Sequence, residues 1–535
     1  MRSFLARRAW LLDTVVLSLL LAAQTHGLFT RTEALTGGAV PYPLDDAYIH
    51  LAVARTLAEH GVWGLRPDHF AACTSSLLWP LALAAARLLG ETSWAPVTLS
   101  SAAATAAVAL ACGALRDEAG LLRRGAVAVL AFAAPLGPLT AMGMEHAPQV
   151  LASLALVHAA SGGLGATAPS RRQWAELAAL AFLATSLRYE GAFLVAALCG
   201  ALALRRRWLG ALAVGAVGAL PPVLFGAYAL AHGGPFFPSS VLLKRAPLPL
   251  GSLGGWLEVF GRIAEGLRAV PSLAFLLAAV LLGWVATSRS RSTDAQALRA
   301  IQAVYLATAV LHLVLARVGH WFRYEAYLVA LGVYVLARTL GRLARQPAVA
   351  ERLALARFRV AAAALAILFC VPLLIRGATA DRAVPYASRN VYAQQFQMAR
   401  LALAFGREAV ALNDIGAVAY FTDVEIVDLW GLASPEVMRA KREGRDDADF
   451  NAQQVARAGA PVAMLYADWY PDTLPSAWTR VGSWRVRNAG ALGNAEVTVF
   501  ATTPEDVPRV RSAFCGVAAT FPPGVTGSTG TEACR

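Results

Sequence analysis

The chain has 535 residues, of which 57% are hydrophobic and only 15% are charged, and its mean hydropathy is +0.52. Soluble domains carry about 25% charged residues, so the composition excludes an ordinary soluble protein and indicates a polytopic membrane protein. The net charge of +13 does not indicate a nucleic-acid partner. The basic residues cluster in short loops between apolar runs, as the positive-inside rule requires of cytoplasmic loops.

The first apolar run, at about residues 9–28, follows Arg7 and Arg8 and has no clear cleavage signature. We expect a retained transmembrane helix with its amino terminus in the cytoplasm. The stretch 75–90 is apolar but short and contains Pro80 and Arg87, so it is predicted to be a juxtamembrane or re-entrant helix within a long first external loop, 29–95. The further spans expected are 96–115, 123–141, 146–162, 172–187, 190–204, 207–231, 270–288, 297–316, 323–341 and 357–375. About eleven spans would place the carboxyl terminus outside.

Two adjacent carboxylates, Asp45 and Asp46, stand between the first apolar run and a short amphipathic pattern that Gly61 is placed to end. The apolar face of this pattern consists of Ile49, Ala52, Val53, Thr56 and Leu57. Such a helix is too short and too charged to cross a bilayer, so we expect it to lie along the membrane surface. One interpretation of the two acids is catalytic. The alternative is that they cap the helix and suit its macrodipole.

Ionisable and aromatic residues also gather at the predicted external ends of later spans. They are Glu145, Arg188, Glu190, Lys244, His320, Arg323 and Tyr324. Ionisable groups at span ends are costly unless they are paired or hydrated, so they are candidates for substrate binding. Each has a structural alternative: Glu145 as the cap of the next helix, Arg188 with Glu190 as an ion pair, Lys244 and Arg245 as snorkelling cations, and the aromatic residues 321, 322 and 324 as an interfacial belt.

Residues 376–535 contain no predicted span and carry an ordinary density of charge. Strands are expected at 409–413, 424–430 and 461–466, a terminal strand pair at 478–487 and 495–500, and a helix start at Ser434-Pro435-Glu436. These elements predict a small external α/β domain, to which no chemistry is assigned. The run from Pro522 to Gly530 indicates a loose terminus. Cys515 and Cys534 could form a disulfide if this tail is extracytoplasmic, and no cysteine or histidine spacing indicates zinc.

An acid at a membrane surface with cations on neighbouring loops suits glycosyl transfer from a polyprenyl-phosphate sugar. The acceptor hydroxyl needs a base, for which Asp45 or Asp46 is the candidate. The departing phosphate needs Lys, Arg or a divalent cation, and Lys244, Arg188 and Arg323 are candidates for that role. Asp46 and Glu145 are the acids that would hold such a cation.

The string Leu44-Asp-Asp-Ala-Tyr-Ile49 resembles the first-loop acidic motif of GT-C membrane glycosyltransferases. It is closest to a bacterial group that includes mycobacterial terminal arabinofuranosyltransferases. Further short stretches are similar to segments of that family: 74–79, 143–145, 188–191, 238–244, and 413–416 with 428–432. By this resemblance Asp45 matches the family's catalytic acid and Asp46 is its neighbour. Tyr189, Ser239 and His146 depart from the usual proline, asparagine and threonine, which leaves the sugar and the acceptor open.

The resemblance implies a GT-C-like polytopic α-helical membrane domain, 1–375, followed by the extracytoplasmic α/β domain, 376–535. It also implies a polyprenyl-phosphate monosaccharide donor, inversion at the anomeric carbon and, in some members, a divalent cation such as Mg or Mn. The acceptor would be a glycan, lipid or protein at the bacterial inner membrane. A transporter or flippase of a lipid-linked saccharide is the alternative, although such proteins place ionisable residues at the midplane within inverted repeats, and no repeat is evident. A polysaccharide polymerase or ligase would instead rely on external arginines.

Overall fold

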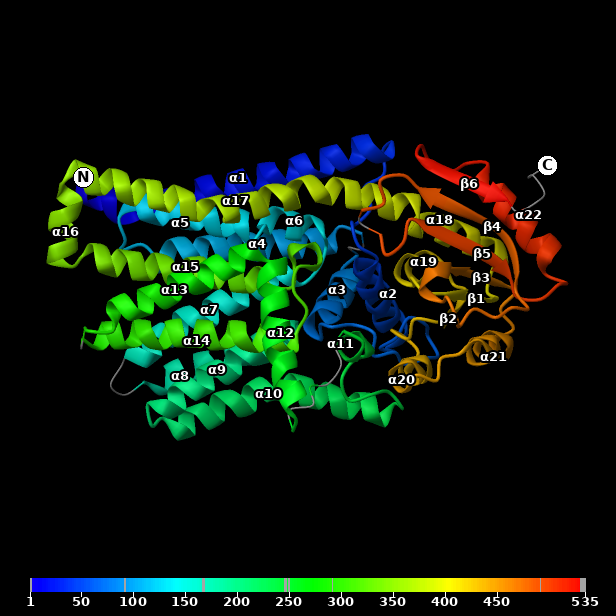
Figure 1. The fold of residues 1–535 in the computed structure, drawn as a ribbon, viewed down its shortest axis with the longest axis horizontal. Helices are drawn as coiled ribbons and strands as arrows, with labels where there is room; N and C mark the ends of the chain where they lie inside the picture. The colour runs from blue at the N-terminus through cyan, green and yellow to red at the C-terminus, as the bar shows by residue number, and fades with distance from the viewer. Residues whose placement is uncertain are drawn as a thin grey trace. The chain divides into compact units, whose positions relative to one another are not determined.

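The computed structural model describes residues 2–90, 93–165, 169–244, 248, 251–290, 292–490 and 492–529 (Figure 1). The chain divides into two compact units. Unit 1 consists of Met1–Gly27, Pro96–Leu224 and Lys244–Arg382, and unit 2 of Leu28–Ala95, Phe225–Leu243 and Ala383–Arg535. The predicted domain boundary between residues 375 and 376 stays a prediction.

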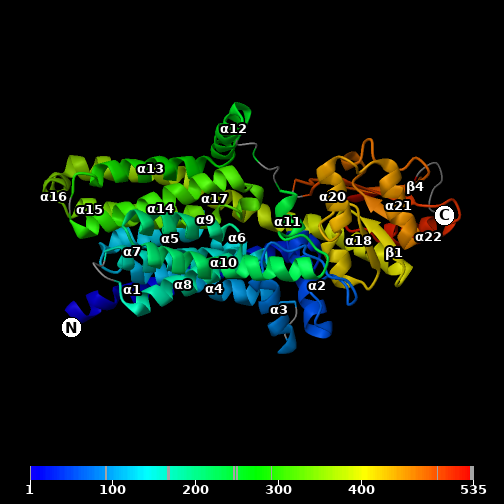
Figure 2. The ribbon, with the colours of Figure 1, turned by 90° about the horizontal axis from the view of Figure 1, so that it is seen from below.

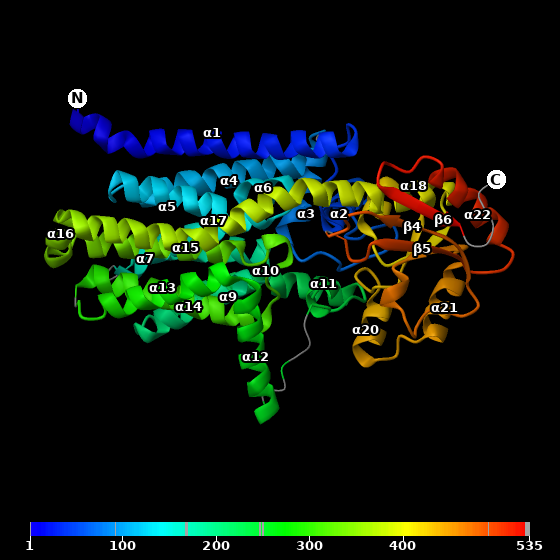
Figure 3. The ribbon, with the colours of Figure 1, turned by 45° about the horizontal axis from the view of Figure 1, so that its top comes forward.

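Long apolar helices make up unit 1, and they run side by side in Figures 1 and 3. Those before the middle of the chain are α1 (Arg2–Thr36), α4 (Ala95–Ala114), α5 (Gly120–Ala133), α6 (Leu136–Ala141), α7 (His146–Gly165), α8 (Arg171–Leu187), α9 (Gly191–Leu204) and α10 (Trp208–Ala231). Those after it are α12 (Leu253–Ala269), α13 (Pro271–Thr287), α14 (Thr293–Leu315), α15 (Ala326–Ala344), α16 (Pro347–Ala354) and α17 (Ala356–Ala393). Helix α15 packs against α5, α7, α13 and α14, and most of its residues are buried.

Eight helices in the described part of the chain are long and apolar enough to cross a membrane, or up to nine if the bent pair α12 and α13 is one span. The protein is therefore a multi-pass membrane protein. Every predicted span falls on one or two helices, but α8 and α9 are short, so the number eleven stays a prediction. Helices α12 and α13 meet at an angle of 108°, and α12 projects away from the other helices in Figure 2.

The first helix ends later than predicted. It continues through residue 28 to Thr36 and stops at Gly37 and Gly38, which both adopt positive φ angles of 74° and 110°. Glycine takes up this left-handed conformation without the steric cost that other residues meet, so the pair ends the helix. The apolar pattern alone missed this end because the residues after 28 form helix with a more polar sequence.

Unit 2 contains the predicted α/β fold around a six-stranded sheet with the order β2-β1-β3-β5-β4-β6. The strands are β1 (Ala409–Leu412), β2 (Glu425–Asp428), β3 (Val462–Leu465), β4 (Thr479–Val486), β5 (Glu496–Ala501) and β6 (Val525–Thr529). Strands β2, β1 and β3 are parallel, and the remaining pairs are antiparallel. The helices of this unit are α2 (Asp45–His60), α3 (Leu78–Leu88), α11 (Ser239–Leu242), α18 (Gln395–Ala402), α19 (Gly416–Phe421), α20 (Pro435–Glu443), α21 (Ala448–Ala458) and α22 (Val507–Ala518).

The predicted loose terminus at 522–530 is wrong for most of its length. Residues Val525–Thr529 form β6, which pairs antiparallel with Gly482–Val486 of β4. The Gly-, Ser- and Thr-rich composition hides this strand because its backbone hydrogen bonds come from a partner about 40 residues earlier in the chain. Cys534 lies outside the described residues, so its predicted pairing with Cys515 stays a prediction.

Candidate functional site

The first feature of the candidate site is an acidic cluster in unit 2, formed by Asp45, Asp46 and Asp414. Helix α2 begins at Asp45, and the residue before it, Leu44, makes no side-chain cap. Asp45 is therefore the first residue of the helix rather than its cap, and it lies with Asp46 in the first turn, where acids suit the macrodipole. Its Oδ2 accepts a hydrogen bond from the backbone N–H of Gly416 at 2.6 Å, and its Oδ1 accepts one from Ala417 at 2.8 Å. Asp45 thus also holds the amino end of α19.

Asp414 and its partner Tyr466 come from the carboxyl ends of neighbouring parallel strands, and its partner Gln395 begins α18 (Gln395–Ala402). Asp414 follows β1, and Tyr466 follows β3 directly. The Tyr466 hydroxyl donates to Asp414 Oδ2 at 2.6 Å, and Gln395 Nε2 donates to the same oxygen at 2.7 Å. Ligands of open α/β sheets bind outside the carboxyl ends of the strands. No chemistry was predicted for this domain from the sequence. The motif Asn-Asp-Ile-Gly at the end of a predicted strand was the feature that could have indicated a site here.

Burial raises the pKa values of both Asp45 and Asp414, and the charge of neighbouring acids adds to the shift, with Asp46 acting on both. Burial is the largest cause for Asp45, followed by the neighbouring Asp414, and together they hold the pKa of Asp45 well above 3.8. The N–H donors of Ala417 and Gly416 oppose this shift without cancelling it. Burial also raises the pKa of Asp414, against the hydrogen bonds from Tyr466 and Gln395. The two carboxyls therefore titrate as a coupled pair, and one gains a proton more readily than an isolated aspartate.

Helix α2 is more enclosed than the predicted surface helix. Its predicted apolar face is mostly buried, but so are His50, with 2% exposure, and Leu51 on other faces. Helix α2 packs between α3 and α19, which accounts for burial on more than one side. Arg55 donates to the backbone carbonyls of Ala419 and Tyr420 near the end of α19. The predicted end of the helix at Gly61 is confirmed, with φ of 71°.

Gly416 allows the close approach of α19 to Asp45. A Cβ at position 416 would lie 2.2 Å from the Asp45 carbonyl oxygen, which real structures do not tolerate. We expect Gly416→Ala to separate α19 from Asp45, to release both hydrogen bonds, and to lower any activity that depends on Asp45. Gly516→Ala in α22 is the matched control, because a Cβ there meets nothing within 4 Å. Thermal unfolding and activity of both variants check this, and equal behaviour of the two would contradict it.

The second feature is a cluster in unit 1 that surrounds the ring of Tyr324, which we call the Tyr324 cluster. Its other members are Arg188, Lys244, His320 and Arg323. Lys244 Nζ lies 4.8 Å from the ring centroid, Arg323 Cζ 5.0 Å and Arg188 Cζ 5.4 Å, and the His320 ring stacks on it at 5.6 Å. Three cations around one aromatic ring are attracted by its quadrupole. Tyr324 is only 6% exposed, so the alternative of an interfacial belt is wrong for this residue.

Arg188 is engaged by two carboxylates. Its Nη1 donates to Glu145 Oε1 at 2.6 Å, and its Nε and Nη2 form a bidentate pair with Glu190 at 3.1 and 2.7 Å. Nη1 also lies 3.0 Å from His146 Nε2. The ion pair between Arg188 and Glu190 that the sequence left open is therefore present, and Glu145 joins it. Buried pairs of this kind keep their charges only with complete hydrogen bonding.

The loop that carries His320, Arg323 and Tyr324 has a strained backbone. It is held in place by Glu325 and Arg376, neither of which was predicted to be a site residue. Trp321 and Phe322 both have positive φ angles, of 56° and 61°. Such conformations cost free energy and persist only where the surroundings enforce them. Glu325 supplies this restraint: it pairs with Arg376 at 2.6 Å and accepts from the Gly319 N–H at 2.7 Å. These two contacts of Glu325 fix the loop that carries His320, Arg323 and Tyr324 of the Tyr324 cluster.

A pocket of about 650 Å³ opens beside this cluster and is lined by both Lys244 and His320. Its other charged lining residues are Arg262, Arg317, Glu258 and Glu265. Arg262 and Glu258 form an ion pair, and Lys244 and Arg317 are the other two cations of the lining. The volume lies within the range of about 300–1,000 Å³ typical of ligand pockets.

Asp46 and Glu145, the two acids predicted to hold a divalent cation, belong to different units. Within the described ranges, no group of three or more His, Cys, Asp or Glu side chains is arranged to hold a metal ion. Glu145 is neutralised by Arg188, which disfavours it as a ligand of a hard cation. The metal roles of Asp46 and Glu145 stay predictions, and no step below depends on them.

Comparison with solved structures identifies the fold as that of GT-C glycosyltransferases. The chain is similar to ArnT from Cupriavidus metallidurans bound to undecaprenyl phosphate, with a TM-score of 0.50, 14% identity, and coverage of 93% of this chain and 99% of that one. It is also similar to the apo oligosaccharyltransferase of Archaeoglobus fulgidus (TM-score 0.53, 12% identity, 92% and 75% coverage). The same organism's AglB in complex with an inhibitory peptide and a dolichol-phosphate has a TM-score of 0.52, 12% identity and the same coverage.

Comparisons of sequence say less about this protein than the comparisons of structure. A family model described as a domain of unknown function, DUF8728, matches residues 389–500. This match covers strands β1 to β4 and all but the last residue of β5, and it includes Asp414 and Tyr466. No curated protein matches the sequence significantly. The likeness to the solved structures is therefore a likeness of fold, and it confirms the predicted fold class.

Proposed function

We propose that this protein is an integral-membrane glycosyltransferase that moves a monosaccharide from a polyprenyl-phosphate donor to a glycan, lipid or protein acceptor. The observation that carries the proposal is the Tyr324 cluster beside a pocket lined by Lys244 and His320. It is a preorganised set of cations at the end of apolar helices, where the phosphate of a membrane lipid would lie. The fold supports the same class, since similar structures hold undecaprenyl phosphate and dolichol-phosphate.

In the proposed reaction, the acceptor oxygen attacks the anomeric carbon of the sugar from the face opposite the phosphate. The bond between that carbon and the phosphate oxygen breaks, and its electron pair remains on the phosphate. The acceptor proton passes to Asp45, and the configuration at the anomeric carbon inverts. Asp46 is the neighbouring acid that would take the proton if Asp45 only positions α19. General bases of this kind contribute about 10²–10⁴-fold to rate.

Lys244 and Arg323 are the proposed ligands of the departing phosphate, and His320 stacks on the same Tyr324 ring. Preorganised cations stabilise charge that develops in the transition state without reorganisation. Arg188, proposed from the sequence as a third phosphate ligand, is instead assigned the role of joining Glu145 and Glu190 into one rigid network. We propose that the active site and residues 376–535 face the extracytoplasmic side of a bacterial inner membrane.

The proposal is tested with the full chain in lipid nanodiscs and a panel of radiolabelled polyprenyl-phosphate pentoses and hexoses. Turnover releases free polyprenyl phosphate and forms a new glycosidic bond with an acceptor from a membrane extract. A flippase would move the same lipids between leaflets of a vesicle and leave the sugar attached. Translocation without any release of polyprenyl phosphate would therefore replace the glycosyltransferase assignment.

The coupled acids predict a specific dependence on pH. Asp45 must be ionised to act as a base, so activity should rise with pH through a midpoint above 3.8, because burial and Asp414 raise its pKa. Asp414→Asn removes the neighbouring charge, so the pKa of Asp45 falls and the acidic limb moves to lower pH. Asp472→Asn, at an exposed position of the same domain, should leave the profile unchanged. An acidic limb that stays in place in Asp414→Asn would exclude Asp45 as the titrating base.

A further inference from the structure

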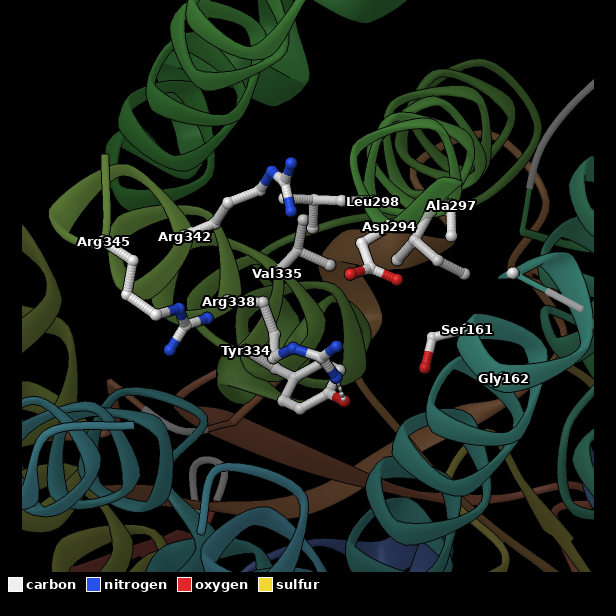
Figure 4. A pocket seen from close by; sticks show the side chains of 12 residues that line it. Ser161, Gly162, Asp294, Ala297, Leu298, Tyr334, Val335, Arg338, Arg342 and Arg345 are labelled. Carbon is white, nitrogen blue, oxygen red and sulfur yellow. Dashed lines mark hydrogen bonds between the residues drawn. The ribbon is translucent and has the colours of Figure 1, made fainter. Parts of the chain in front are cut away.

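A second cavity, of about 460 Å³, lies at the other ends of the unit 1 helices. It is enclosed by the carboxyl end of α7, the first turns of α14 and the last turns of α15. Figure 4 shows the guanidinium groups of Arg338 and Arg342 and the carboxylate of Asp294 around the same space. Nothing in the proposed transfer reaction uses this cavity.

Three arginines line the cavity, Arg338 and Arg342 in α15 and Arg345 directly after it, and they differ in how they are neutralised. Arg345 forms an ion pair with Glu118 at 2.6 Å. In the described part of the chain, Arg338 donates to the Tyr334 hydroxyl at 3.1 Å, and Arg342 donates to Ser292 Oγ at 2.6 Å and Ser290 Oγ at 3.3 Å. The Nε of Arg342 is buried without a hydrogen-bond partner in the part of the chain that the structure describes. Two guanidinium groups therefore retain donors and positive charge for an anion.

The α14 wall of the cavity carries Asp294 in its first turn and, beyond it, an apolar stretch of Ala297, Leu298 and Ile301. A free phosphate ion would gain nothing from such a stretch, whereas a phospholipid presents a phosphate joined to an apolar body. Basic pockets between transmembrane helices are known to suit anionic lipid headgroups. The planar fork of arginine matches the oxygen atoms of a phosphate group.

The length of the helices places this cavity at the opposite membrane face from the Tyr324 cluster. Helix α7 has 20 residues and α15 has 19, so each is about 30 Å long, close to the hydrocarbon thickness of a bilayer. The amino ends of both helices follow Glu145 and Glu325, near the Tyr324 cluster, and their carboxyl ends enclose the cavity. The cavity is thus at headgroup depth in the other leaflet.

We propose that this cavity binds the phosphate headgroup of an anionic phospholipid, with Arg338 and Arg342 as its ligands and Ala297, Leu298 and Ile301 against its glycerol and proximal acyl chain. The site is separate from the donor site and does not depend on the proposed function.

The test uses the delipidated full-length protein in detergent, with phosphatidylglycerol, phosphatidylcholine or inorganic phosphate as the probe. Native mass spectrometry measures the lipid retained, and thermal unfolding measures stabilisation. Phosphatidylglycerol should be retained and should raise the unfolding midpoint, phosphatidylcholine should be weaker, and inorganic phosphate should have no effect. The double variant Arg338→Gln/Arg342→Gln should lower the apparent affinity for phosphatidylglycerol about tenfold or more, through the loss of two charge-assisted contacts.

Arg352→Gln/Arg357→Gln is the matched control, because it removes two exposed arginines of α16 and α17 that do not line the cavity. It should retain phosphatidylglycerol as the unmodified chain does. Ser161→Phe fills the cavity and leaves every charge in place, so it should also lower the retention of phosphatidylglycerol. It therefore tests the site even if the double variant fails to fold. Equal retention in Ser161→Phe and the unmodified chain, or equal losses in the double variant and its control, would overturn the site. Equal stabilisation by inorganic phosphate would overturn its assignment to a lipid.

Discussion

Replacing Asp45 by asparagine is expected to lower the rate of sugar transfer by about 10²–10⁴-fold, because an amide cannot take the proton of the acceptor hydroxyl. The measurement is the single-turnover release of polyprenyl phosphate from the nanodisc-bound protein. The residual activity should also lose its acidic limb, since the titrating group has been removed. Asp68→Asn, an exposed acid of the same loop that pairs with Arg66, should retain full activity.

The fold should survive this substitution. An asparagine oxygen can accept from one of the two N–H groups that Asp45 holds, and an orphaned N–H costs about 1–3 kcal/mol. Part of this cost is offset, because the repulsion between Asp45 and Asp414 disappears. If Asp45 were only an anchor for α19, then Asp45→Asn and Gly416→Ala would lose activity in proportion to the loss of folded protein, and the acidic limb would persist. Asp46→Asn would then be the variant that abolishes transfer.

Arg188→Met should be the most destabilising single substitution in unit 1, by about 3–5 kcal/mol, because it leaves the carboxylates of Glu145 and Glu190 buried without their cation. Arg188 is 1% exposed and Glu145 is fully buried, so water cannot replace the lost partner. The midpoint of thermal unfolding in detergent and the yield of monodisperse protein measure the effect. Arg116→Met is the control, since Arg116 and Asp117 form an exposed pair at 3.8 Å, and such pairs contribute about 0–1 kcal/mol.

A charge-balanced variant separates structure from chemistry at this network. Arg188→Met combined with Glu145→Gln and Glu190→Gln removes all three charges, so most of the lost stability should return. Transfer activity should return only in part, because the Tyr324 cluster would still lack one of the cations around its ring. If the triple variant is as unstable as Arg188→Met alone, the buried carboxylates are not the source of the instability.

Many of the helices and strands could be predicted because their signals are local. Apolar runs mark the spans, Gly61 ends α2, Ser434 begins α20, and short stretches rich in apolar residues mark β1 to β5. The errors fall where the signal is weak or comes from a distant partner. The polar continuation of α1 to Thr36 carries no hydropathy signal, and β6 depends on β4 for its hydrogen bonds.

The residue types of the candidate site could also be predicted from the sequence: adjacent acids after the first span, and cations with aromatic residues at later span ends. Their partners were not, because each contact joins residues far apart in the chain. Asp45 meets Gly416 across 371 positions, and Arg188 meets Glu145 across 43. The periodicity of a sequence records which side of an element is buried, whereas the choice of partner depends on how the elements pack. Packing is what makes Asp414 the neighbour of Asp45 and gathers three cations around Tyr324.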